Sequence, residues 1–270
     1  MTRIALVVSD VDGTLLTKDK TLTDKTARAV RQLEDSGVGF TIVSSRPTIG
    51  MRFLVEPLRI TLPVGSFNGS SISDPQMNPI EQHLIPASTA QRSIDVLNQF
   101  GVDIWLFTHD TWFAQNAAAE YNPFEKRTIK VDPVIAPDFA PYLSAACKIV
   151  GSSSDAALLQ RCEAAMQDAV GMQATAVRSQ SYYLDITPPG YDKGTFVQTM
   201  AKRLGISTDA VATVGDMHND LAMFRTSGLS IAMGNATDDI KRQATHVTTS
   251  NQDEGFAGAM DIVMKNNEGK

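Results

Sequence analysis

The chain has 270 residues, of which 43% are hydrophobic and 20% are charged, and its formal net charge at pH 7 is −6. These values are typical of a soluble globular protein with one large or two modest domains, and no segment approaches the roughly 20 apolar residues that span a bilayer. An acidic chain without a cluster of lysines and arginines lacks the electrostatic footprint of a nucleic-acid binder, so small molecules are the expected ligands. The apolar stretch near the amino terminus is too short and too polar for a secretory signal, which predicts a cytoplasmic protein.

The first expected strand is the apolar run Ile4–Val8, and two carboxylates, Asp10 and Asp12, stand at its carboxyl end. Such a run predicts a strand buried on both faces, and ligands of open α/β sheets collect at the carboxyl ends of these strands. One carboxylate there could attack phosphorus while the other transfers a proton. The alternative is an acidic turn or a calcium loop, but a calcium loop would need glycine and glutamate where the chain has Leu15 and Thr21.

Parallel βαβ units are expected over the following residues. Thr23 is predicted to cap a helix that stops near Gly37, and strands are expected at Val38–Val43 and Pro63–Phe67. Ser44 ends the second strand, where its hydroxyl and the following amide could hold phosphate oxygens. The alternative for Ser44 is an ordinary turn in which the hydroxyl bonds to the local backbone.

The pattern changes after about residue 81. Helix-like segments alternate there with paired strand-like runs, twice in succession, which predicts two loose copies of an antiparallel α+β unit. We therefore expect an inserted domain over residues 83–187 and a parallel-sheet core built from residues 1–82 and 188–270. The cysteines, Cys147 and Cys162, have no disulfide or metal spacing and are expected in the core. Several side chains of the insert could line a pocket, although packing in the core is the commoner role of such aromatics: Trp105, His109, Trp112, Tyr182 and Tyr183.

The parallel pattern resumes with a helix that begins at Lys193 and a strand at Val211–Val214. The strand leads into a second acidic cluster, which contains Asp216 and Asp220. Carboxylates from two strand ends can share one Mg²⁺, which prefers oxygen ligands. The alternative for the cluster is helix capping, and the alternative for Lys193 is a solvated lysine. Residues 266–270 are expected to form a loose tail.

In chain order these motifs resemble those of the haloacid dehalogenase superfamily of phosphohydrolases. The matching positions are Asp10-Val-Asp12-Gly-Thr14, Ser44, Lys193, and Gly215-Asp216 through Asn219-Asp220. The inserted segment resembles the C2-type cap of the Cof-like branch, HAD subclass IIB, and Gly234-Asn235-Ala236 also resembles that branch. The resemblance implies an α/β fold with a Rossmann-like parallel-sheet core and an inserted α+β cap that sets substrate specificity. One departure is Ser44-Ser45, where the branch usually has threonine then glycine; Ser45 would be strained if the loop required a positive φ.

The resemblance implies Asp10 as the nucleophile, which forms an aspartyl-phosphate, and Asp12 as general acid and then base. Lys193 would neutralise charge and, with three further residues, hold phosphate: Ser44, Ser45 and Asn219. Mg²⁺ would be bound by Asp10, Asp12 and Asp216, with Asp220 behind them.

The expected function is hydrolysis of small phosphomonoesters such as sugar phosphates. The alternatives are a phosphosugar mutase of the same superfamily and, less favoured, a non-catalytic ligand-binding module. The expected partner is a small phosphorylated metabolite, with no nucleic acid and no membrane, and the chain is expected to be a monomer or a weak homodimer.

Overall fold

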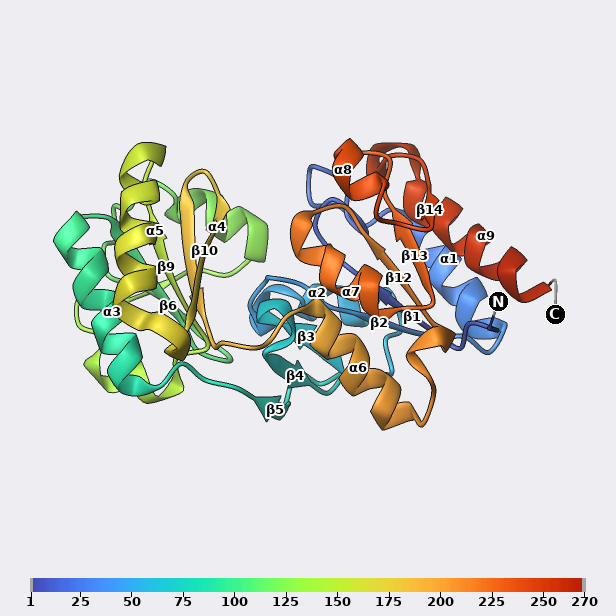
Figure 1. Cartoon of the computed structure of the whole chain (residues 1–270), viewed down its shortest axis with the longest axis horizontal. Helices are drawn as coiled ribbons and strands as arrows, with labels where there is room; N and C mark the ends of the chain where they lie inside the picture. The colour runs from blue at the N-terminus through green and yellow to red at the C-terminus, as the bar shows by residue number, and fades with distance from the viewer. Residues whose placement is uncertain (1, 269–270) are drawn as a thin grey trace. The chain divides into compact units, whose positions relative to one another are not determined.

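The computed structural model describes residues 2–268, which form two compact units (Figure 1). The first unit contains the chain up to Ser45, residues Arg52–Asn78, and the chain from Tyr191 on; the second contains Arg46–Met51 and Pro79–Gly190. The second unit thus starts four residues before the insert expected from the sequence and also takes in a short segment that follows Ser45. None of the helices in the described part of the chain is long and apolar enough to cross a bilayer.

The first unit is built on a parallel sheet with the strand order β14-β13-β12-β1-β2. Its strands are β1 (Leu6–Ser9), β2 (Gly39–Ile42), β12 (Val211–Gly215), β13 (Leu229–Ala232) and β14 (His246–Val247). Two short antiparallel strands, β3 (Val64–Ser66) and β4 (Ser71–Ser73), follow β2. Because β1 lies in the middle, with β12 and β2 as neighbours, the residues that follow these three strands meet at one edge of the sheet.

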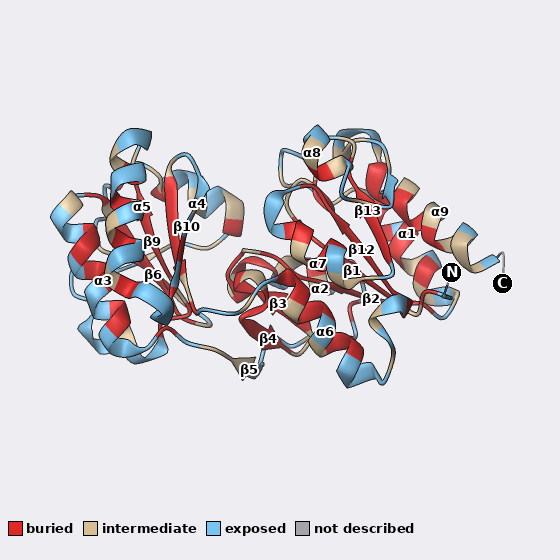
Figure 2. Ribbon diagram, viewed as in Figure 1, coloured by how far each residue is buried: buried red, intermediate tan, exposed pale blue. Residues whose placement is uncertain are grey.

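Helices cover both faces of this sheet, as expected for buried parallel strands. They are α1 (Asp24–Asp35), α2 (Arg52–Val55), α6 (Lys193–Leu204), α7 (Leu221–Thr226), α8 (Asp238–Lys241) and α9 (Gly255–Glu268). Leu6 and Val8 of β1 pack in one cluster with side chains of α6 and α7. On the other face Phe40 of β2 meets Phe256 of α9 edge to face, with ring centroids 6.0 Å apart. The strands β1, β2, β12 and β13 are accordingly almost fully buried, whereas the short edge strand β14 is exposed, and the helices expose their outer sides (Figure 2).

The helix ends follow the sequence signals. Thr23 caps α1, its side chain accepting a hydrogen bond from the Thr26 amide at 3.1 Å. Asp192 caps α6 through a reciprocal capping box with Thr195. The expectation of a loose tail is wrong for residues 266–268, because α9 continues to Glu268 and the Asn267 side chain bonds both the amide and the carbonyl of Ile4. The rest of that expectation, residues 269–270, lies outside the described residues.

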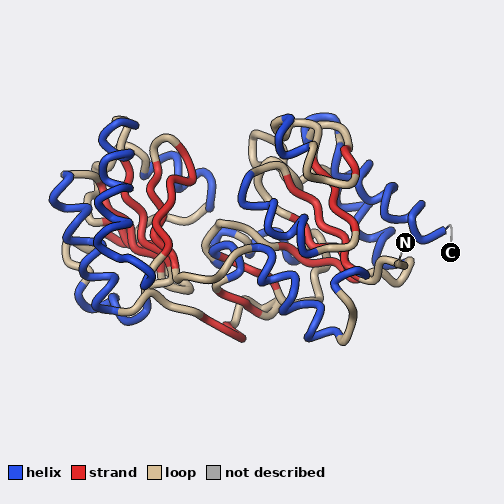
Figure 3. The backbone as a smooth tube through the Cα atoms, viewed as in Figure 1, coloured by secondary structure: helices blue, strands red, loops and turns tan. Residues whose placement is uncertain are grey.

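The second unit is an antiparallel sheet in the order β10-β11-β9-β6-β7, with β8 added in parallel to β7. Its elements are β5 (Pro79–Gln82), α3 (Ala87–Phe100), β6 (Asp103–Phe107), β7 (Trp112–Ala114), α4 (Asn122–Ile129), β8 (Val134–Ile135), β9 (Lys148–Ser152), α5 (Ala156–Val170), β10 (Thr175–Gln180) and β11 (Tyr183–Thr187). Figure 3 shows the two units by secondary structure. The expected α/β fold, with a parallel-sheet core and an α+β insert, is confirmed.

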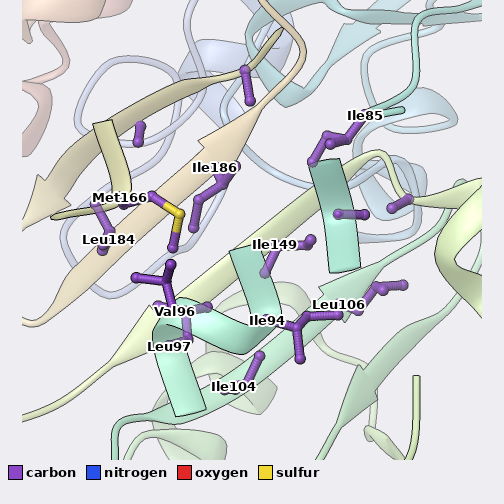
Figure 4. Close-up of a cluster of buried hydrophobic side chains, with 14 of the residues drawn as sticks. Ile85, Ile94, Val96, Leu97, Ile104, Leu106, Ile149, Met166, Leu184 and Ile186 are labelled. Carbon is purple, nitrogen blue, oxygen red and sulfur yellow. The ribbon is translucent and has the colours of Figure 1, made fainter. Parts of the chain in front are cut away.

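Two cores lie on the two faces of the second unit's sheet. On one face the strands contribute Ile104, Leu106, Ile149 and Ile186, which pack with residues of α3 and α5 (Figure 4). On the other face Trp105 contacts Trp112 and Tyr183 edge to face, with centroids 5.3 and 5.1 Å away. These three aromatic rings are buried, so they are core residues rather than exposed pocket walls.

The side chains of Cys147 and Cys162 are buried in the same unit, as expected. His109 of the second unit lies on the wall of a cavity of about 490 Å³ that Thr108 and Tyr142 also line.

Candidate active site

Asp10 lies at the carboxyl end of β1, and its backbone amide donates to the Val214 carbonyl of β12 at 2.9 Å. This bond extends the β1–β12 ladder by one residue, so the end of the strand fixes the position of the Asp10 backbone. The side chain is only 7% exposed. A carboxylate placed this deeply requires a partner of opposite charge, because burial strongly disfavours its ionised form.

Lys193 supplies that charge. It is the first residue of α6, is 1% exposed, and its Nζ lies 2.5 Å from Asp10 Oδ1 and 2.5 Å from Asp220 Oδ1. Asp220 turns its other oxygen to the backbone amides of Asp216 and Met217, at 2.8 and 2.9 Å. Asp220 therefore fixes both the lysine and the loop that carries Asp216.

Asp216 follows β12 and is held by side chains that approach it from two other loops. Thr14 donates to Asp216 Oδ1 at 3.0 Å, and the Asn235 amide donates to Oδ2 at 3.1 Å. The same Asn235 amide nitrogen bonds the Gly13 carbonyl at 2.9 Å. The Asp216 carboxylate consequently has a fixed orientation before any ligand binds.

The three carboxylates form one cluster in which ligand atoms of Asp10, Asp216 and Asp220 all lie within 4.8 Å of one another. If all three are ionised, the cluster with Lys193 has a net charge of −3 + 1 = −2. A buried excess of two negative charges matches a divalent cation, and carboxylate oxygens are the donors that Mg²⁺ prefers. The residues present therefore fit a hard divalent metal ion.

The pKa values in the cluster reflect this crowding. Burial raises the pKa of Asp10 to about 8, although the adjacent Lys193 ammonium opposes the shift. Burial, followed by repulsion from Asp220, raises the pKa of Asp216 to about 7. For Lys193 burial opposes charge, but the attraction of Asp10 and Asp220 is greater in sum and raises its pKa. Without a metal ion, the cluster thus keeps its ammonium and retains protons on its carboxylates near neutral pH.

These shifts give the metal-free protein a defined pH dependence. A carboxylate whose pKa is raised on folding stabilises the fold at acid pH, and this contribution is lost as the pH rises through about 7 and about 8, the values for Asp216 and Asp10. Mg²⁺ competes with the same protons. The rise in melting temperature caused by Mg²⁺ should therefore be larger at about pH 8.5 than at about pH 6.

Thermal unfolding with and without Mg²⁺ at the two pH values checks this prediction. Asp216→Asn is the matched control: it should raise the melting temperature of the metal-free protein at the higher pH and abolish the response to Mg²⁺. An equal Mg²⁺ response at both pH values would contradict the assignment.

The other residues singled out in the sequence lie on loops around this cluster. Asp12 is bound by Lys20, whose Nζ is 2.6 Å from Oδ1. Ser44 is buried after β2, and its amide donates to the Gly65 carbonyl at 3.0 Å. Ser9 and Ile42, the last residues of β1 and β2, are in register. Ser44 therefore has the same position beyond β2 that Val11 has beyond β1. The backbone of Ser45 has no positive φ, so serine at this position carries none of the strain that the departure from glycine suggested.

Asn219 lies in the loop that follows β12. Its side-chain amide donates to Asn68 Oδ1 at 3.0 Å, and Asn68 is in the left-handed region with φ 59°. The loops after β12 and β3 thus meet through these two side chains. Arg46 belongs to the second unit, where it is buried and donates to the carbonyls of Gly50 and Thr128.

Gly13 leaves the space that Asp216 occupies. Its φ is +82°, and a Cβ at this position would lie 2.3 Å from Asp216 Oδ2. Gly13→Ala should therefore displace Asp216 and greatly weaken the Mg²⁺ response. Gly37 is the matched control, because its φ is +81° and nothing lies within 4 Å of its Cβ position. Gly37→Ala should add backbone strain of about 1 kcal/mol and leave Mg²⁺ binding intact, as calorimetry of the two variants can show. Equal Mg²⁺ affinities would contradict the role of Gly13.

A cluster of carboxylates around one buried ammonium, at the carboxyl edge of a parallel sheet covered by helices, is typical of α/β enzymes that act on phosphoryl groups. The family model for haloacid dehalogenase-like hydrolases matches residues 7–260, and the chain belongs to this family. The expected family is thereby confirmed.

Curated relatives and solved structures agree with this membership. The 5-amino-6-(5-phospho-D-ribitylamino)uracil phosphatase YcsE of Bacillus subtilis is 26% identical to this chain, with 95% of this chain and 94% of the relative covered. A haloacid dehalogenase-like hydrolase from Bacteroides thetaiotaomicron has a TM-score of 0.90 at 24% identity, covering 96% of this chain and 99% of that structure. A sugar phosphatase of HAD subclass IIB has a TM-score of 0.80 at 19% identity, covering 95% and 97%. The expectations of the Cof-like branch and of an enzyme of the phosphatase class are confirmed.

Proposed function

We propose that this protein is a Mg²⁺-dependent phosphatase that hydrolyses small phosphomonoesters through an aspartyl-phosphate on Asp10. The observation that carries the proposal is the placement of the Asp10 carboxylate against Lys193, in one cluster with Asp216 and Asp220. Asp10, Asp216 and the backbone carbonyl of Asp12 would hold the metal ion. When bound, Mg²⁺ would supply positive charge that neutralises phosphate oxygens and lowers the pKa of the acidic cluster.

The two half-reactions use Asp10 and Asp12 in turn. An Asp10 oxygen forms a bond to phosphorus while the bond to the leaving oxygen breaks, and Asp12 gives that oxygen a proton. Water then attacks the phosphorus of the aspartyl-phosphate, Asp12 accepts the proton of the water, and Asp10 is released as a carboxylate. Lys193 would offset the negative charge of the phosphoryl group in both steps.

Phosphate binding is proposed for loop residues at the same sheet edge. The hydroxyl of Ser44, the amide of Ser45 and the side-chain amide of Asn219 are donors suited to phosphate oxygens, and Lys193 provides a charge. The first unit would thus perform the chemistry. Following the domain expectation, residues 83–187 would act as the C2-type cap that selects the substrate.

The substrate class proposed is a phosphorylated sugar or a similar small metabolite. The Bacillus subtilis relative is named for a substrate whose phosphate is on a ribityl chain, which is a sugar-derived alcohol. A phosphate on a primary alcohol needs proton donation to the leaving oxygen, and Asp12 offers it.

Phosphate release from an aryl phosphate and from a panel of sugar phosphates, measured with Mg²⁺ and with a chelator, tests the proposal. Turnover that requires Mg²⁺ is expected. The absence of phosphate release from every ester, or turnover that is unchanged by the chelator, would overturn it.

A further inference from the structure

Two lysines contact the two catalytic carboxylates separately. Lys193 is buried and contacts Asp10, whereas Lys20 contacts Asp12, with 2.6 Å between Lys20 Nζ and Asp12 Oδ1. Nothing in the reaction proposed above uses Lys20. Its contact with the carboxylate that would transfer protons in both half-reactions suggests a specific task.

The Lys20 contact is not explained by stability. The side chains of Lys20 and Asp12 are 30% and 27% exposed, and ion pairs this accessible add little to stability because water screens them. Moreover, the backbone of Lys20 has a φ of 58°, in the left-handed region that glycine and asparagine favour. A lysine in this conformation is strained, and the strain offsets much of the stability that the ion pair could add.

The loop that carries Lys20 is closed by its own hydrogen bonds. The Lys20 amide donates to the Thr17 carbonyl at 2.9 Å, and the Thr17 amide donates to the Thr21 carbonyl at 3.0 Å. The loop is also tied to the fold, since the Asn251 side chain donates to the Leu16 carbonyl at 2.8 Å. The ammonium of Lys20 is therefore presented from a fixed base, which is what a group that orients another side chain requires.

We propose that Lys20 is a positioning residue that orients the Asp12 carboxylate for the hydrolysis of the aspartyl-phosphate. In this step the oxygen of water bonds to phosphorus as the bond between phosphorus and Asp10 breaks, and the proton of the water passes to Asp12. A base must lie within hydrogen-bonding distance of the proton that it accepts, so a contact that fixes the direction of the Asp12 carboxylate also fixes how far the proton must travel. The inference rests on the function proposed above.

Steady-state kinetics with an aryl phosphate separates the two half-reactions. An aryl oxide leaves without help from an acid, so kcat/KM reports transfer to Asp10, whereas kcat includes the hydrolysis of the intermediate. Lys20→Met should lower kcat by at least about tenfold, a part of the 10² to 10⁴ that acid–base catalysis typically supplies, with kcat/KM nearly unchanged. Phosphorylated Asp10 should then accumulate, which mass spectrometry of acid-quenched samples detects. Lys20→Arg should restore most of the lost kcat.

Controls distinguish positioning from a structural role. Lys18→Met removes an exposed lysine from the same loop and should change neither constant. In an Asp12→Ala background, Lys20→Met should have no further effect, because the carboxylate that it orients is gone. Equal losses in kcat and kcat/KM, an unchanged kcat, or an additive effect with Asp12→Ala would overturn the inference while leaving the phosphatase in place. If the wild type releases no phosphate from any ester, the proposed function fails and the inference fails with it.

Discussion

Asp10→Asn should reduce phosphate release by at least about 10⁴-fold, because the amide cannot attack phosphorus and no other side chain in the cluster has the same position. The substitution conserves shape, and it removes a carboxylate whose pKa burial raises to about 8. The variant should therefore fold, and its melting temperature without Mg²⁺ should match or exceed that of the wild type at mildly alkaline pH.

Phosphate release from an aryl phosphate at saturating Mg²⁺ measures this effect. Asp35→Asn removes an exposed carboxylate at the end of α1 and serves as the control for loss of charge alone. Activity of the Asp10 variant within about tenfold of the wild type would assign the nucleophile elsewhere, since removing a nucleophile costs far more.

Lys193→Met should have the second largest effect, on activity and on stability together. The ammonium is 1% exposed between Asp10 and Asp220, so its removal leaves two buried carboxylates without their cation. Breaking a buried ion pair in this way typically costs about 3 to 5 kcal/mol. Urea unfolding of the metal-free protein above pH 8 should show a loss of this order, and turnover should fall by about 10³-fold.

A second substitution separates the two effects of Lys193. The double variant Lys193→Met/Asp220→Asn lacks one of the two buried carboxylates that the single variant leaves without a cation. Much of the lost free energy of unfolding should therefore return, while activity stays low. A single Lys193→Met variant with unchanged stability would mean that the buried ion pairs do not form in solution.

The parallel core was predictable because its signals are local. The strand that begins at Val211 and the start of α6 at Lys193 are where the sequence predicts them, and Thr23 and Asp192 both act as helix caps. In these places an apolar run or a capping residue is sufficient to set the boundary of an element.

The carboxyl-terminal helix α9 was not predicted, because its ordering depends on distant contacts. Asn266 and Asn267 are polar residues near the end of the chain and suggest a loose tail, yet Asn267 bonds the backbone of Ile4 from 263 positions away. The short helix α4 was missed as well; its residue Asn122 accepts a hydrogen bond from the buried Trp105 indole. Tertiary hydrogen bonds of this kind leave no periodic pattern in the sequence.

The sequence predicts the carboxylates of the candidate site but not the residues that orient them. Two carboxylates after one strand and another cluster after a later strand indicate where chemistry lies, but the residues that orient them come from loops without a distinctive pattern. Thr14 and Asn235 belong to the motifs, but the sequence alone assigns no role to either. The structure shows that both donate hydrogen bonds to Asp216. Nothing in the sequence indicates a role for Lys20, because a lysine in a polar turn is ordinarily solvated.

The central claim is that the Asp10 carboxylate attacks phosphorus, and trapping the covalent intermediate tests it most directly. The Asp12→Ala variant is suited to this measurement, because it can still transfer phosphate from an aryl ester but lacks the base that hydrolyses the product. After acid quench and digestion with pepsin, we expect the added mass of one phosphoryl group on the peptide that contains Asp10, and none in Asp12→Ala/Asp10→Asn. A phosphoryl group on another residue, or turnover by Asp12→Ala without any covalent adduct, would contradict the account.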